Sequence, residues 1–135
     1  MKIYKTKVKR LAGTNYSEVY AIAHTIYKDI ARKTKRRPYI RSAYFNKDKV
    51  FLDYFWDHIR MKNPQDRARR LKYYKCALDL IQNSRVEPIS KQNPNRLSET
   101  LHRFSGVNGN HDVFFVQIKE NVRNSEKYFM SVFPE

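Results

Sequence analysis

The chain has 135 residues, of which 41% are hydrophobic and 14% aromatic, which is the size and composition of one folded domain and excludes a disordered basic tail. Its 28 Lys and Arg outnumber 13 Asp and Glu, and the resulting charge of +15 is far above the magnitude of about 2–8 that is usual for a small domain. No apolar run reaches the roughly 18 residues that a membrane-spanning helix needs, and the basic start lacks the apolar segment of a signal peptide.

The N-terminus and the single cysteine bear on domain organisation and compartment. Residues 1–14 are basic and are interrupted by Gly13, so we expect them to form a loose arm before a single domain of residues 15–135. Cys76 has no second cysteine to pair with, and a lone thiol is typical of a reducing compartment. The sequence therefore predicts a cytoplasmic protein.

The first predicted element is a helix from Ser17 to about Thr34. Its apolar residues recur at the spacing of one helix face: Val19, Ile22, Ala23, Ile26 and Ile30. Ser17 is a suitable N-cap, with Asn15 as the alternative, because both side chains can accept a hydrogen bond from a first-turn amide. Pro38 ends any helix before it.

Aromatic and β-branched residues then predict two short strands and a short helix. The strands cover 39–45 and 49–52, and Asn46-Lys47-Asp48 between them is expected to form a hairpin turn. From 53 to about 61 the apolar spacing becomes helical. His58 lies in this segment, and we interpret it as a helix-surface histidine and not as a metal ligand.

A second, basic helix is predicted from Pro64 to about Gln82. Asn63 can cap it, proline suits the first helical position, and Asp66 is favourable near the positive helix start. Its apolar seam consists of Leu71, Tyr74, Leu78 and Ile81, and most of its arginines lie off this seam.

The C-terminal third has the pattern of a three-stranded meander. Strands are predicted at 101–107, 112–119 and 127–133, with a type I′ turn at Asn108-Gly109, after a long loop over 83–98. The complete pattern predicts an α+β fold, in which an N-terminal helix and a basic central helix pack on a small antiparallel β-sheet that ends in this meander.

The positive charge predicts a polyanionic partner. Lys and Arg are dense in 28–41 and 60–75, with tyrosines among them, and this mixture suits RNA or single strands because cations hold phosphates and aromatic rings stack on unpaired bases. A membrane surface fits less well, because the basic helix also carries acidic residues and few bulky apolar ones. The predicted substrate-binding residues are Arg37, Arg41, Tyr44, Arg67, Arg69, Arg70 and Gln117.

Motifs for cofactors and metals are absent from the sequence. The chain has only three glycines, so it lacks a glycine-rich phosphate loop, and its four histidines and single cysteine do not have zinc-ligand spacing. We therefore expect neither a cofactor nor a metal.

Several segments resemble a phage- and mobile-element-linked family of the barnase–EndoU–colicin–RelE-like nuclease superfamily. They are RPYIRSAYFNKDKVFLDYFWDHI, LHRFSG, FFVQIKEN and KYFMSVFP, of which VQIKE followed by SVFP is the most telling. The resemblance extends from about Ser17 to Pro134. It implies helices packed on a small antiparallel sheet and metal-independent RNA cleavage, often by a toxin with an antitoxin or immunity protein as its partner. That superfamily has no invariant catalytic set, so the resemblance assigns no residue roles.

Metal-independent RNA cleavage needs a base for the 2′-OH, an acid for the 5′ oxygen and cations for the phosphate. The predicted catalytic residues are His102, Arg103, Lys119, Tyr128 and Ser131. We expect His102 and Lys119 to meet at one end of the meander and share a phosphate. The predicted function is an endoribonuclease acting on tRNA or mRNA that leaves a 2′,3′-cyclic phosphate. The alternative is a non-catalytic RNA- or single-strand-binding module.

Overall fold

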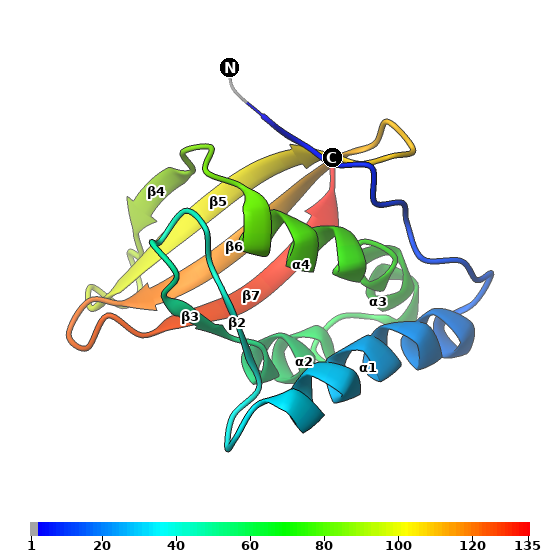
Figure 1. Ribbon diagram of the computed structural model, residues 1–135, viewed down its shortest axis with the longest axis horizontal. Helices are drawn as coiled ribbons and strands as arrows, with labels where there is room; N and C mark the ends of the chain where they lie inside the picture. The colour runs from blue at the N-terminus through cyan, green and yellow to red at the C-terminus, as the bar shows by residue number, and fades with distance from the viewer. Residues whose placement is uncertain (1–2) are drawn as a thin grey trace.

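The computed structural model describes residues 3–135, so residues 1 and 2 of the expected arm lie outside the described part. It is an α+β fold, as predicted, with helices gathered on one side of a curled sheet (Figure 1). The elements in chain order are β1 (Tyr4–Lys5), α1 (Tyr16–Lys33), β2 (Tyr39–Arg41), β3 (Lys49–Phe51), α2 (Asp53–Ile59), α3 (Pro64–Leu71), α4 (Tyr74–Asn83), β4 (Ile89–Gln92), β5 (Glu99–Val107), β6 (Val113–Asn121) and β7 (Lys127–Pro134).

The sheet is mixed and not purely antiparallel. Its strand order is β1-β5-β6-β7-β3-β2, with β4 also paired to β5. The β5-β6-β7 meander is antiparallel, as predicted, and so are the β2–β3 and β4–β5 pairs. However, β1 runs parallel to β5, and β3 runs parallel to β7, so the predicted antiparallel sheet is wrong at both positions. These parallel pairs join segments far apart in the chain, so no turn sequence between the two strands predicts them.

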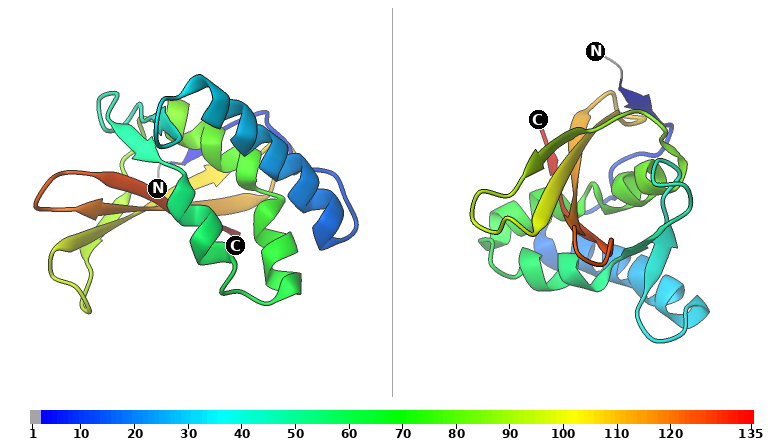
Figure 2. Two further views of the ribbon diagram at one scale, coloured as in Figure 1. Left: turned by 90° about the horizontal axis from the view of Figure 1, so that it is seen from below. Right: turned by 90° about the vertical axis from the view of Figure 1, so that its left-hand side faces the viewer.

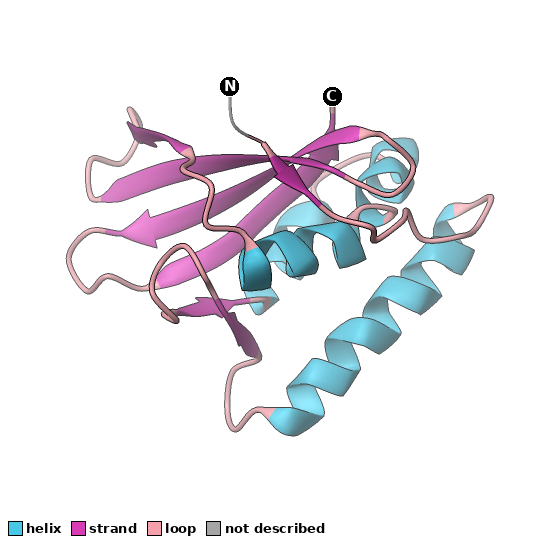
Figure 3. Ribbon diagram, turned by 45° about the horizontal axis from the view of Figure 1, so that its top comes forward, coloured by secondary structure: helices cyan, strands magenta, loops and turns pink. Residues whose placement is uncertain are grey.

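One face of the meander forms the core with the helices (Figure 3). Phe55 of α2 stacks on Phe129 of β7 with ring centres 4.6 Å apart, and Tyr74 of α4 lies 6.1 Å from the same ring. The strand residues on this face alternate with more exposed ones, and those fully or almost fully buried are Phe104, Phe114, Val116, Ile118, Phe129 and Val132. The hydrophobic alternation of the sequence thus fixes which face of the sheet the helices cover.

Two predicted helix starts are confirmed in detail. The Asn15 side chain accepts a hydrogen bond from the Glu18 amide at 3.1 Å, so Asn15, the alternative to Ser17, caps α1. The Asn63 side chain accepts from the Asp66 amide at 2.8 Å, with Pro64 at the first helical position of α3.

The predicted helix 64–82 is two helices in the structure, because the helical conformation is interrupted between Leu71 and Tyr74. The Lys72 carbonyl accepts a hydrogen bond from the Leu11 amide at 2.8 Å, and the Tyr73 amide bonds to the Arg70 carbonyl, three residues back. The N-terminal segment thus occupies the Lys72 carbonyl, which in a continuous helix would accept a hydrogen bond from an amide of the next turn. The break lets α3 lie against β7 while α4 covers the core.

The described part of the N-terminal arm is not loose, which corrects the expectation for 1–14. β1 pairs with the end of β5, and the Tyr4 hydroxyl donates to Asp79 of α4 at 2.7 Å. The Gly109 amide donates to the Val8 carbonyl at 2.8 Å. Residues 3–14 therefore cover the turn between β5 and β6 and then reach the break between α3 and α4.

The turn between β5 and β6 differs from the predicted type I′ form. Val107 pairs with Val113, so five residues connect the strands, and the residue with positive φ is His111, at 66°. Gly109 is instead required by close approach, because a Cβ atom there would lie 2.3 Å from the Lys7 carbonyl oxygen. The His111 side chain is exposed.

Gly109→Ala should therefore destabilise the protein by about 1–3 kcal/mol, the usual cost of overpacking, by pushing the N-terminal segment away from the turn. Urea unfolding measures this cost. His111→Asn in the same turn is the control. Its effect should stay within about 0.5 kcal/mol, because the His111 side chain is exposed and asparagine tolerates the positive φ of this position. Equal stability of Gly109→Ala and the parent would contradict this account of the glycine.

The remaining differences concern short strands. The predicted strands 39–45 and 49–52 form, but they are shorter, because Asn46 and Lys47 both have positive φ in a wide loop. The predicted loop 83–98 contains β4, which pairs antiparallel with the first half of β5. All four residues of β4 are exposed, so an apolar pattern could not reveal it.

Candidate nucleic-acid interface

The two faces of the meander carry different side chains. In an antiparallel pair, directly opposed residues point to the same face. The pairings Arg103↔Gln117 and Gln117↔Ser131 therefore put three predicted site residues on one face, and Lys119↔Tyr128 adds two more. We call this the outer face, because it lies opposite the buried residues that pack against the helices (Figure 2).

Helices α2 and α3 lie along β7 and bring further side chains to the outer face. Tyr54 and His58 are one turn apart on α2, and their rings stack with centres 5.8 Å apart. Lys119 Nζ is 4.0 Å from the centre of the Tyr54 ring. From α3, Arg70 donates a hydrogen bond to Ser131 Oγ at 2.7 Å. Residues from helices and strands thus meet at one place.

Cations and aromatic rings alternate across this place. The guanidinium carbons of Arg70 and Arg103 lie 5.4 and 5.7 Å from the centre of the same Phe133 ring. Lys119 Nζ lies 5.4 Å from the Tyr128 ring. We define the outer cluster as Tyr54, His58, Arg70, Arg103, Gln117, Lys119, Tyr128, Ser131 and Phe133. Alternating cations and rings form a surface that can hold phosphates and stack bases.

The three cations of the outer cluster differ in how far they are neutralised. Arg70 pairs with Asp66 at 3.0 Å, and Lys119 pairs with Glu99 at 3.4 Å. Arg103 is exposed and makes no ion pair with any of residues 3–135. Arg103 is therefore the cation that a phosphate would reach first.

His58 is the one histidine in the outer cluster. It is half-buried on α2, and burial lowers its pKa below 6.5, helped by the positive charges of Lys62, Arg70 and Lys119. The imidazole is therefore neutral at pH 7 and can accept a proton. The sequence interpretation of His58 as a plain helix-surface histidine overlooked this neighbourhood, whose members come from three separate segments.

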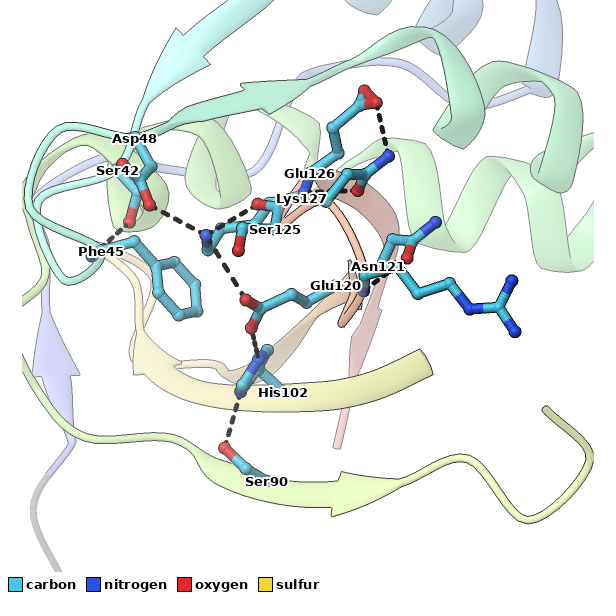
Figure 4. Close-up of polar contacts among 12 residues, drawn as sticks. Ser42, Phe45, Asp48, Ser90, His102, Glu120, Asn121, Ser125, Glu126 and Lys127 are labelled. Atoms are coloured by element: carbon cyan, nitrogen blue, oxygen red, sulfur yellow. Dashed lines mark hydrogen bonds and ion pairs between the residues drawn. The ribbon is translucent and has the colours of Figure 1, made fainter. Parts of the chain in front are cut away.

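His102 lies on the opposite face of the sheet, in a buried polar network that Figure 4 shows. Its ring nitrogens contact Ser90 Oγ at 2.6 Å and Glu120 Oε1 at 2.8 Å. Lys127 Nζ lies 3.6 Å from Glu120 and 2.8 Å from Asp48. Only 8% of His102 is exposed. The network ties β4 to the meander and to the β2–β3 loop.

The expected meeting of His102 with Lys119 is therefore half right. Leu101 pairs with Lys119, so both residues do lie near one end of the meander. They point to opposite faces, however, because His102 is paired with Ile118 of the buried set, and this arrangement does not let them share a phosphate.

The contacts of His102 have the residue types of a Ser-His-acid triad but not its geometry. In such triads Nε2 faces the serine and Nδ1 the carboxylate. Here Ser90 contacts Nδ1 and Glu120 contacts Nε2, and the carboxylate is also shared with Lys127. The arrangement is that of a structural network and not of an activated nucleophile.

Five predicted binding residues lie outside the outer cluster, and three of them belong to residues 37–44. Arg37 sits at the margin of the cluster, 5.5 Å from the Tyr128 ring, but its Nε and one terminal nitrogen donate to Asp53, which raises the pKa of Arg37. Arg41 is exposed on β2 and donates to the Lys47 carbonyl. Tyr44 packs edge-on against Phe104, 5.6 Å away, on the core side.

The arginines of α3 point in three directions. Arg70 reaches the outer cluster, whereas Arg67 lies 5.5 Å from the Tyr16 ring of α1. Arg69 pairs with Asp66 at 3.1 Å and lines a pocket beside the N-terminal segment with Arg10. Arg69 and Arg70 both pair with Asp66, three and four residues back on the helix, but beyond it they reach different neighbours.

In comparisons with known proteins, no protein-family model, curated protein or solved structure matches the chain. The resemblance drawn from its short segments therefore stays a prediction. Across residues 3–135, His, Cys, Asp and Glu side chains nowhere gather in threes that could hold a metal ion. Within the same residues, no helix has the length and apolar character to span a membrane.

Proposed function

We propose that the protein is a metal-independent endoribonuclease with toxin-like use, which binds RNA over the outer cluster and cleaves it by attack of the substrate's own 2′-OH. The observation that carries this proposal is the convergence of Arg70, Arg103 and Lys119 around one imidazole and two phenols. Cations can stabilise the charge that develops on the phosphate, and a neutral imidazole can accept the 2′-OH proton.

Each residue has a definite part in this proposal. Arg103 and Lys119 hold the phosphate, and Arg70 adds positive charge while it orients the Ser131 hydroxyl. His58, in place of the predicted His102, takes the proton of the 2′-OH as the O2′–P bond forms. The P–O5′ bond breaks, and the leaving 5′ oxygen takes a proton from solvent. Tyr54 and Tyr128 offer ring faces on which bases can stack. His102 is assigned to the fold, through its contacts with Ser90 and Glu120.

The partners and setting follow from the charge and the proposed chemistry. The charge of +15 suits RNA, with tRNA and mRNA both as candidates. A toxin of this kind would need an acidic antitoxin or immunity protein in the cell that makes it. Cys76 is buried and unpaired, which accords with action in the cytoplasm.

The proposal is tested by incubating the purified protein with total RNA in EDTA. Cleavage without metal supports it. Activity that is lost in EDTA and restored by magnesium or zinc would contradict the mechanism. Binding without any cleavage would favour the alternative, a non-catalytic RNA-binding module that uses the same surface.

We expect the affinity for single-stranded RNA to depend steeply on salt, and replacement of Arg103 by alanine to flatten this dependence. Each phosphate contact on a single strand contributes about 0.7 to the slope of log affinity against log salt concentration, so losing one contact should remove about that amount. Fluorescence anisotropy with a labelled oligonucleotide at several salt concentrations measures the slope.

Arg69→Ala is the matched control for this experiment. Like Arg103→Ala, it removes one positive charge. Arg69 lies on α3, however, and its side chain points away from the outer cluster, is 55% exposed and pairs with Asp66. The slope should therefore stay unchanged. A larger loss in Arg69→Ala than in Arg103→Ala would place the RNA on the other side of α3.

A further inference from the structure

A pocket of about 680 Å³ lies between α1 and the α2–α3 region, apart from the outer cluster. One wall is a row of aromatic rings on α1: Tyr16, Tyr20, His24 and Tyr27. Neighbouring rings in this row are 5.6, 5.0 and 5.9 Å apart, and Tyr20 and His24 are nearly parallel, at 12°. These residues recur every three or four positions, so they form one continuous stripe along the helix.

Trp56 of α2 closes the pocket against this stripe. Its ring stands nearly perpendicular to those of Tyr20 and His24, with centres 5.7 and 5.3 Å away. It is the single tryptophan of the chain. The pocket thus combines broad ring faces with a fixed aromatic partner, which is the construction that holds a flat ring.

The rim of the pocket carries charges of both signs. Asp57 and Arg60 form an ion pair with side chains 73% and 72% exposed, so their polar atoms are free to exchange partners. Asp53 and Arg67 also line the pocket, so its acidic and basic residues are equal in number. On a chain of charge +15, a balanced pocket does not suit a phosphate. It suits an uncharged flat group with donors and acceptors along its edge.

Helix α2 separates this pocket from the outer cluster. Tyr54 and His58 face the outer cluster, whereas Trp56, Asp57 and Arg60 line the pocket. An α-helix is about 10 Å across with its side chains, a distance that a few nucleotides of single-stranded RNA can cross. A strand whose phosphates lie on the outer cluster can therefore place a base in the pocket.

We infer that the pocket between α1 and α2 binds an unpaired base of the RNA, and that guanine is the base it prefers. The base stacks on the Tyr20 ring, which His24 supports from its other side. The Asp57 carboxylate accepts hydrogen bonds from guanine N1–H and its amino group, and Arg60 donates to O6. This inference rests on the proposed function for its substrate and adds a site of base recognition.

Trp56 reports on the pocket directly, because it is the only tryptophan and lines the wall. We expect guanosine, which has no phosphate and cannot be cleaved, to quench Trp56 fluorescence in a saturable manner, and adenosine, cytidine and uridine to bind more weakly. Tyr20→Ala should weaken guanosine binding about tenfold, as expected for loss of one stacking surface. Asp57→Asn, an exposed change that leaves the fold intact, should abolish the preference for guanosine over adenosine.

Arg103→Ala is the control, because it removes a cation of the outer cluster and leaves the pocket unchanged; its guanosine titration should match that of the parent. The inference is overturned if none of the four nucleosides quenches Trp56, or if Asp57→Asn keeps the same preference. Guanosine binding by a protein that cleaves no RNA would refute the proposed function alone, whereas cleavage without nucleoside binding would refute the pocket alone.

Discussion

Replacing His58 by alanine should lower the rate of RNA cleavage by about 10²–10⁴, the usual cost of losing a general acid or base, with little change in stability. His58 is the imidazole of the outer cluster, stacked on Tyr54 beside Lys119. Its side chain makes no hydrogen bond within residues 3–135, so its loss breaks no polar network there. Single-turnover cleavage of a defined oligonucleotide measures the rate.

The pH profile of kcat/KM tests the same assignment. The pKa of His58 is lowered below 6.5, so the free imidazole loses its proton as pH rises through that lower value. A base must be unprotonated, so the rate should rise with pH, with the midpoint of the rise below pH 6.5, and then level off. His102→Ala is the control: it should lower the melting temperature and keep the cleavage rate per folded molecule. The reverse outcome, a stable and inactive His102→Ala with an active His58→Ala, would show that the sequence expectation for His102 was correct.

Replacing Lys127 by methionine should destabilise the protein by about 3 kcal/mol, the lower end of the cost of breaking a buried ion pair. Only 4% of Lys127 is exposed, and its ammonium group lies between Asp48, Glu120 and the Ser125 carbonyl. Without it, the Glu120 carboxylate keeps its contact with His102 but loses its cation. Asp48 is 56% exposed and can return to water, which keeps the cost at the lower end.

Lys49→Met is the matched control, since Lys49 is exposed on the adjacent strand β3 and makes no ion pair with residues 3–135. Its effect should stay within about 0.5 kcal/mol. Urea unfolding of both variants gives the two costs, and cleavage per folded molecule should match the parent in each. Equal stability of the two variants would mean that the buried network contributes nothing to the fold.

Local patterns predicted the parts of this fold that depend on neighbouring residues. The alternation of Phe114, Val116 and Ile118 identified a strand and its buried face, and Asn63-Pro64 identified the start of a helix. The errors arise where distant segments intervene. The helix break at Lys72 depends on a hydrogen bond from the Leu11 amide. The parallel strand pairs join segments that are distant in the chain, since Tyr4 pairs with Gly106 and Val50 pairs with Lys127.

The residues of the candidate site likewise fall into those that a local pattern predicts and those that depend on distant segments. Gln117 and Lys119 are two positions apart on one strand, so the sequence alone places them on the same face, and the register adds Arg103, Tyr128 and Ser131 to it. His102 was expected beside Lys119 because the hairpin brings both residues to one end of the meander. The register puts their side chains on opposite faces, since His102 pairs with Ile118 and Lys119 pairs with Leu101. His58 and Arg70 lie on helices, and no local sequence pattern predicts that these helices pack against β7. The spacing of Tyr54 and His58 by one turn, beside the separate apolar pair Phe55 and Ile59, was the available signal.

The central claim is that the outer cluster cleaves RNA through the substrate's 2′-OH, and the ends of the products test it most directly. A defined RNA oligonucleotide is incubated with the purified protein in EDTA, and its fragments are analysed by mass. The account predicts fragments that end in a 2′,3′-cyclic phosphate and begin with a 5′-hydroxyl, and intact substrate when its 2′-OH groups are replaced by 2′-O-methyl groups. Fragments with 3′-hydroxyl and 5′-phosphate ends, or cleavage of the 2′-O-methyl substrate, would contradict it.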